Sequence, residues 1–147
     1  MNRPAQDHRT DRGSLSLETA ILAPVLLTAL LIVIAAGRIH LADNTVDAAA
    51  RNAARAASLE RDGNTARSEG DRIARQTLQD QGMRCTSLSV RVPTGGFTAT
   101  LGTPASVTVT ITCHLNLSDL TLPGFPGSKT ITARFTSPID PYRGRPS

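Results

Sequence analysis

The sequence predicts an α+β protein: a long N-terminal transmembrane helix that continues outside the membrane, a second helix, and a small three- to four-stranded antiparallel sheet with one disulfide. Three observations predict this fold. Residues 19–37 form an uncharged, apolar run of 19 residues, and an Ala-rich stretch with helical periodicity follows them. From residue 86 onward, apolar side chains recur at every second position, as they do in half-buried strands.

The apolar run is long enough to cross about 30 Å of hydrocarbon. A cleaved secretory signal is the alternative, because Ala35, Ala36 and Gly37 offer a small-residue cleavage site. Such signals have an apolar core of roughly 7 to 15 residues, which is shorter than this run. We therefore expect an anchor at residues 14–38.

The charges that flank the run predict its orientation. Arg3, Arg9 and Arg12 precede it, whereas Arg38 is the only basic residue that closely follows it. This bias predicts a cytoplasmic N-terminus and an extracytoplasmic C-terminal part, and hence a single-pass protein of the cell membrane.

Two further helical stretches follow the run. Residues 45–59 carry apolar side chains near the helical period: Val46, Ala49, Ala50, Ala53, Ala56 and Ala57. Residues 62–64 predict a stop and a new N-cap, and a second helix from residue 65 to about 81 ends at Gly82. Its expected apolar face is Ala66, Ile73, Ala74, Thr77 and Leu78. Both faces are poor in large side chains, so each helix needs a sheet or a neighbouring subunit to pack on.

The remainder of the chain alternates as strands do. Residues 86–92 predict a first strand, 93–96 a turn, 97–101 a short second strand, and 105–117 the clearest strand. After a Pro- and Gly-containing loop at 118–128, residues 129–136 are expected to close the sheet with Ile131, Ala133 and Phe135 facing inward. Residues 137–147 are expected to be an extended and mobile tail.

The two cysteines, Cys85 and Cys113, both fall in the part expected outside, where a disulfide is stable. The bond would close a loop of about 29 residues and stabilise the fold by roughly 3 kcal/mol. Regular alternation places Cys85 on the face opposite Leu88, so the bond requires a bulge or twist there. Metal binding is the alternative, since His114 adjoins Cys113, but no CxxC or HxxxH spacing exists. We predict no metal site and no cofactor.

The charge and motif content narrows the function classes. The net charge of +4 is spread along the chain without a basic block or interleaved aromatic residues, so the sequence predicts no nucleic-acid binding. His8, His40 and His114 are isolated, and no GxSxG motif, carboxylate pair or Gly-rich phosphate loop is present. We therefore predict that the protein is not an enzyme.

The apolar run has two unusual residues near its start, Glu18 and Pro24. A charge near hydrocarbon costs at least a few kcal/mol unless it finds a partner, so Glu18 needs an explanation. Pro24 cannot give a hydrogen bond to the carbonyl of Ala20, which predicts a helix kink there. A proline that is merely tolerated near the helix start is the equal alternative.

Gly13 directly before Ser14, with Glu18 at the fifth position after Gly13, resembles a type IV prepilin leader. The resemblance implies that a prepilin peptidase cleaves after Gly13 and leaves Ser14 as the new N-terminus. It also implies that Glu18 meets the free amine of Ser14 on a neighbouring subunit during assembly. Two opposite charges that pair in an apolar bundle cost far less than one left alone.

The resemblance extends to the TadE-like pseudopilins of Flp, or tight-adherence, pilus systems. Glu18 followed by Pro24, the Ala- and Arg-rich residues 46–57, and the late residues 140–143 are similar to that family, whereas Thr19 replaces its usual aromatic or larger apolar residue. The family implies a minor pilin-like subunit used in surface adhesion or secretion. Its implied partners are the prepilin peptidase, other pilin or pseudopilin subunits, the membrane platform of the pilus machine and the lipid bilayer.

The expected organisation is therefore a cytoplasmic prepilin-type leader (1–13), a transmembrane helix (14–38), an extracytoplasmic helical region (39–82), an antiparallel β region (83–137) and a flexible tail (138–147). Two other readings stay open. One is a single-pass, membrane-anchored extracellular binding domain with no pilus role, in which Gly13 and Glu18 are coincidental. The other is a secreted enzyme that ordinary signal cleavage releases.

Overall fold

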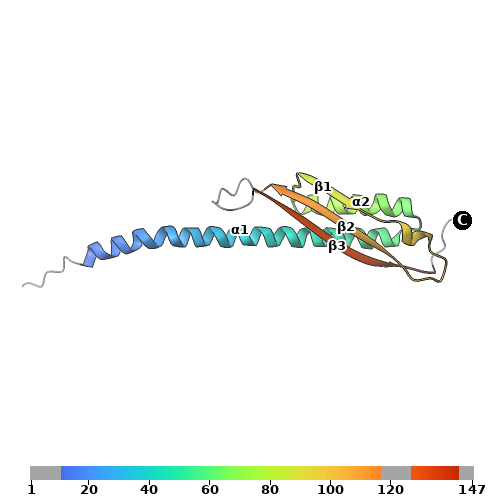
Figure 1. Cartoon of the computed structure of the whole chain (residues 1–147), viewed down its shortest axis with the longest axis horizontal. Helices are drawn as coiled ribbons and strands as arrows, with labels where there is room; N and C mark the ends of the chain where they lie inside the picture. Colours follow the sequence, from blue (N-terminus) through green and yellow to red (C-terminus); the bar gives the residue numbers. More distant parts are fainter. Residues whose placement is uncertain (1–10, 117–126, 143–147) are drawn as a thin grey trace, which may run out of the picture. The chain divides into compact units, whose positions relative to one another are not determined.

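The computed structural model describes residues 11–116 and 127–142, with side chains from Glu18 onward. The chain divides into two compact units, Met1–Arg38 and Ile39–Ser147. Its elements are α1 (Asp11–Leu59), α2 (Gly63–Asp80), β1 (Ser87–Arg91), the 3-10 helix η1 (Gly95–Thr98), β2 (Ala105–Asn116) and β3 (Ser128–Ile139) (Figure 1). The predicted α+β class is confirmed, with a long apolar N-terminal helix, a second helix and three antiparallel strands.

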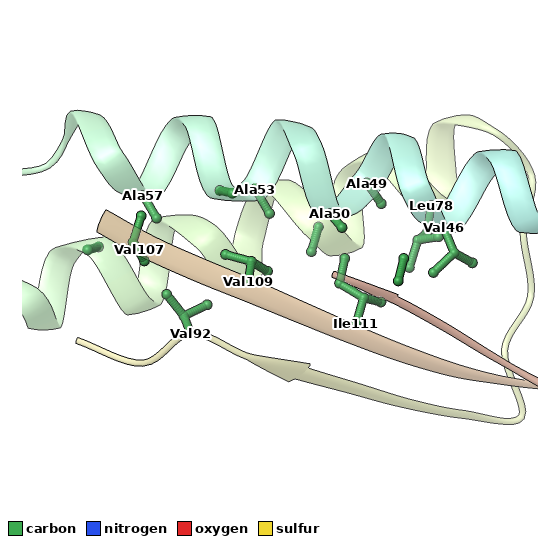
Figure 2. Close-up of a cluster of buried hydrophobic side chains, with 14 of the residues drawn as sticks. Val46, Ala49, Ala50, Ala53, Ala57, Leu78, Val92, Val107, Val109 and Ile111 are labelled. Carbon is green, nitrogen blue, oxygen red and sulfur yellow. The ribbon is translucent and has the colours of Figure 1, made fainter. Parts of the chain in front are cut away.

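The C-terminal part of α1 packs through small side chains. Its buried residues are Val46, Ala49, Ala50, Ala53, Ala54 and Ala57. Figure 2 shows alanines of this face directed at Val107, Val109 and Ile111 of β2. The spacing is that of one helical face, as predicted, except that Ala56 is half-buried and Ala54 takes its place in the core. Alanine lets the helix lie close to the sheet.

Helix α2 has a defined cap at each end. The Asp62 side chain accepts hydrogen bonds from the N–H groups of Asn64 and Thr65 at 2.9 and 3.0 Å, so the helix begins slightly before the predicted residue 65. At the other end, Gly82 adopts a φ of 67° and the Met83 N–H donates to the Leu78 carbonyl at 2.9 Å, which is a Schellman motif. The predicted N-cap region and glycine stop are confirmed.

The buried residues of α2 are Ala66, Gly70, Ala74 and Leu78, each four residues from the next. A Cβ at Gly70 would lie 3.4 Å from the Cβ of Ala57 and 3.6 Å from the Ala53 carbonyl oxygen. These are ordinary contacts, whereas the same Cβ would lie only 3.1 Å from the Cγ2 atom of Val92, so Gly70 leaves room for the Val92 side chain. The apolar face predicted from the sequence did not include Gly70, because the prediction relied on the spacing of apolar side chains and glycine has no side chain.

The sheet has the order β1-β2-β3, and both pairs are antiparallel (Figure 1). Alternate residues face the helices and form the core with them, chiefly Val92, Val107, Val109, Ile111, Cys113, Ile131, Ala133 and Ile139. The other face carries Ser, Thr and Arg side chains and is exposed or half-buried. This is the predicted half-buried antiparallel pattern.

The predicted strand at residues 97–101 is wrong. Residues Gly95–Thr98 form η1 instead, with the Phe97 N–H donating to the Thr94 carbonyl at 3.0 Å and the Phe97 ring buried. Because β1 pairs directly with β2, this segment is not inserted as a strand between them. The ring of Phe97 contributes to the core from a short turn rather than from a strand.

The end of the chain also differs from the prediction. Strand β3 continues to Ile139 and buries Ser137 and Ile139, so the expected mobile tail is wrong for residues 137–139. Pro138 is compatible with this position because β3 is an edge strand. Phe135 is 38% exposed rather than part of the core. Residues 117–126 of the predicted loop and 143–147 of the predicted tail lie outside the described residues.

The predicted disulfide between Cys85 and Cys113 is confirmed, with the two Cα atoms 5.4 Å apart. The chain bends at Thr86, whose N–H and hydroxyl both donate to the His114 carbonyl, at 2.8 and 2.9 Å. The regular alternation of β1 therefore begins only at Ser87, and Cys85 lies outside it. The bend provides the departure from strand geometry that the sequence required for this bond.

Gly96 lies against the backbone of β2, and its neighbour provides a matched control. A Cβ at Gly96 would lie 2.5 Å from the carbonyl oxygen of Ser106, whereas a Cβ at Gly95 would meet nothing within 4 Å. We expect Gly96→Ala to lower the free energy of unfolding by about 1–3 kcal/mol. Gly95→Ala should change it by less than about 1 kcal/mol. Thermal unfolding of both variants checks this, and equal melting temperatures would contradict the close contact.

Candidate membrane and assembly segment

The N-terminal part of α1 presents a long apolar surface. An 18-residue window within Glu18–Leu59 has a mean hydropathy of 2.6. The large apolar side chains between Ile21 and Ile34 are 45–67% exposed. Exposed apolar surface of this extent marks a membrane or protein contact. By length and composition, α1 is the one helix within residues 11–116 and 127–142 that can cross a membrane, and it is a candidate single-pass anchor.

Glu18 lies at the start of this surface and is exposed. Among the described side chains, its carboxylate makes no ion pair or hydrogen bond. Ser14 lies within the backbone of α1, one helical turn before Glu18. Its nitrogen is therefore a peptide N–H in the uncleaved chain, and it becomes a free amine only if the bond after Gly13 is cut.

Pro24 lies inside α1, and the helix continues through it. The Thr28 hydroxyl donates to the Pro24 carbonyl at 2.7 Å, which is the local hydrogen bond expected of a threonine in a helix. The kink at Pro24 stays a prediction.

Beyond the apolar run, the Ala- and Arg-rich residues separate into two faces. Ala53 and Ala54 are buried, whereas Arg51 and Arg55 are exposed. The two arginines, with Ala48, Asn52 and Phe135 of β3, line a hollow of about 180 Å³. The Ala- and Arg-rich stretch is therefore one core face beside one solvated, basic face of the same helix.

The two histidines within the described residues, His40 and His114, do not form part of a metal site. His40 is exposed, and the Nδ1 atom of His114 lies 2.8 Å from the Thr130 hydroxyl on the outer face of the sheet. Within residues 11–116 and 127–142, no group of three or more His, Cys, Asp or Glu side chains is placed to hold a metal ion.

Comparison with known proteins gives one match, at the start of the chain. A family model described as TadE-like protein matches residues 13–55. These residues are similar to TadE-like proteins. The TadE-like segment, residues 13–55, contains Gly13, Ser14, Glu18, Pro24 and the first part of the Ala- and Arg-rich stretch, so the resemblance seen in the sequence is confirmed for these residues, whereas the one at residues 140–143 stays a prediction. The sheet lies outside it, and no curated protein or solved structure matches the chain.

TadE-like proteins are components of the Tad, or Flp, pilus system, and the family is not known for enzymatic activity. The TadE-like segment coincides with the apolar and Ala-rich parts of α1. The similarity therefore concerns the candidate membrane span and the part of α1 that packs against the sheet.

Proposed function

We propose that this protein is a minor pilin-like subunit that takes part in assembly of a Tad (Flp) pilus, used in surface adhesion or secretion. The observation that carries the proposal is the coincidence of the TadE-like segment with a membrane-length apolar helix that has a carboxylate at its head. In the proposed topology, residues 14–38 span the cell membrane, the N-terminus is cytoplasmic, and residues 39–147 lie on the other side.

The position of Glu18 supports a processed N-terminus. A carboxylate at the edge of hydrocarbon is costly by itself, but a nearby amine offsets that cost. Cleavage after Gly13 would create such an amine at Ser14, at the new start of α1. We propose that Glu18 of one subunit pairs with the Ser14 amine of a neighbour, so that only a processed and correctly placed subunit satisfies the charge.

The exposed apolar side chains of α1 support the proposed lipid and protein partners. A single helix cannot bury residues 21–34 within its own chain unit, where they are exposed. Lipid, other pilin or pseudopilin subunits and the membrane platform of the machine would cover them. The prepilin peptidase would act first, because it generates the N-terminus on which the pairing depends.

We predict that the mature chain begins at Ser14. Mass spectrometry of the protein recovered from membranes, expressed with its pilus system, should find residues 1–13 removed. Replacement of Gly13 with valine should leave the chain uncut, because the resemblance to a prepilin leader implies that the peptidase cleaves after glycine, and valine is bulky. An intact residue 1 would favour an unprocessed anchor, and a start near Arg38 would favour a secretory signal.

A further inference from the structure

The outer face of the sheet, which points away from both helices, is basic and rich in hydroxyl groups. Strands β1, β2 and β3 contain no Asp or Glu. Arg91 and Arg134 lie on this outer face and are exposed, while the remaining cation of the strands, Lys129, pairs with Asp43 of α1 at 3.3 Å. The face therefore has positive charge and no carboxylate of its own strands to balance it.

The register brings the two arginines onto one row. Arg91 of β1 lies opposite Thr110 of β2, and Thr110 lies opposite Arg134 of β3. Outer strands on either side of a central strand are about 10 Å apart, so two arginine side chains can converge above the residue between them. Both line one hollow of about 330 Å³, together with Thr110.

The polar groups of this row are unpaired. Within the described residues, neither guanidinium has a carboxylate partner, and the Thr110 hydroxyl has no hydrogen bond to another side chain. In contrast, Thr108 and Thr136 bond to each other at 2.8 Å. Arginine matches the two oxygens of a carboxylate or sulfate with two parallel N–H groups. The row thus offers donors for one oxyanion.

The surroundings point to a saccharide as the carrier of that anion. The same hollow is lined by the hydroxyls of Ser89, Thr108 and Thr112, which can exchange hydrogen bonds with sugar hydroxyls. The outer face presents no Phe, Tyr or Trp side chain on its strands, since Phe135 lies on the core side, and its one imidazole, His114, lies outside the hollow, so the hollow lacks the aromatic stacking platform that single-stranded nucleic acids use. Exposed ion pairs are individually weak, so a ligand with several polar contacts is favoured over a free ion.

We propose that the outer face of the sheet binds an anionic saccharide, with its carboxylate or sulfate above Thr110 and between Arg91 and Arg134. This inference does not depend on the pilus role. The affinity of the purified full chain in non-ionic detergent is measured for polygalacturonate, which carries a carboxylate on each sugar. Neutral dextran and polyglutamate serve as comparison polymers, and sodium sulfate is added as a competitor against sodium chloride at equal ionic strength.

The wild-type chain should bind polygalacturonate and show little binding to dextran. The double variant Arg91→Gln/Arg134→Gln should weaken binding at least about tenfold, because two charge-assisted contacts are lost. Arg67→Gln removes the same kind of charge from an exposed position on α2 and should change the affinity by less than about twofold. All three proteins should unfold at the same temperature, since these side chains are exposed.

Four outcomes would overturn the proposal: no binding of polygalacturonate by the wild-type chain, equal binding of dextran, an equal loss in Arg67→Gln, or binding of polyglutamate as tight as that of polygalacturonate. The last would assign the face to an acidic peptide. Sulfate should displace polygalacturonate beyond the effect of matched sodium chloride, because it competes with the saccharide's anionic group for the same two guanidinium groups.

Discussion

Replacement of both Cys85 and Cys113 with alanine should lower the free energy of unfolding of the unit Ile39–Ser147 by about 3 to 4 kcal/mol. The bond joins residues 28 positions apart, and loop closure of this length in the unfolded chain accounts for most of that value. Cys113 is also fully buried in the core. The effect is large because net stabilities of small domains are only about 5–15 kcal/mol.

The loss should be greatest in β1. This strand has five residues and pairs with one neighbour, and the disulfide lies directly before it, so the bond fixes it to β2. Hydrogen exchange of the full chain in detergent should show faster exchange of β1 amides in the alanine variant, with a smaller change in β3. A reductant should produce the same change in the wild-type chain and none in the variant. Unchanged exchange after reduction would show that the sheet does not need the bond.

Much of the sheet was predictable because the pattern that assigns each side chain to the core or to the solvent face lies within the sequence of a single strand. The Val and Ile side chains of β2 alternate with Thr, and the structure places the two sets on opposite faces. The disulfide followed from the extracytoplasmic location expected for this part of the chain and from the presence of two cysteines. The helices followed from Ala periodicity and from the cap residues Asp62 and Gly82, which act within one turn of their own positions.

The errors came from features that depend on tertiary placement. Residues 97–101 alternate like a strand, yet β1 pairs directly with β2, and the segment between them forms η1 and buries Phe97 instead. Phe135 has the parity of the core face but lies beside the exposed arginines of α1, where it is only partly covered. Gly70 carries no side chain to reveal its packing role. In each case the deciding neighbour is far away in the sequence.

The two candidate sites also differ in whether they depend on local sequence or on tertiary placement. Gly13, Ser14, Glu18 and Pro24 lie within one short segment, so their spacing is visible in the sequence. The row of Arg91, Thr110 and Arg134 exists only because of the register of three strands, and a slip of one residue would turn one of its side chains to the core. Periodicity places each arginine on the outer face of its strand but does not show that the two share one row.

Replacement of Glu18 with alanine should permit cleavage after Gly13 but reduce incorporation of the subunit into the assembly at least about tenfold. In the proposed contact, the variant leaves the Ser14 amine of a neighbour unpaired in apolar surroundings, and loss of one partner of a buried ion pair costs about 3–5 kcal/mol. The measurement compares the amount of processed subunit that copurifies with the other pilus components with the amount left free in the membrane.

Asp47→Ala is the matched control for this prediction, because it removes an exposed carboxylate from the same helix outside the apolar run. It should assemble like the wild-type chain. Combining Glu18→Ala with Gly13→Val should add little further loss, since an uncut chain has no amine to offer and the two changes disable one pairing. Normal incorporation of the processed Glu18→Ala variant would reject the pairing, while a start at Ser14 would still support the leader. The two parts of the proposed function can therefore fail separately.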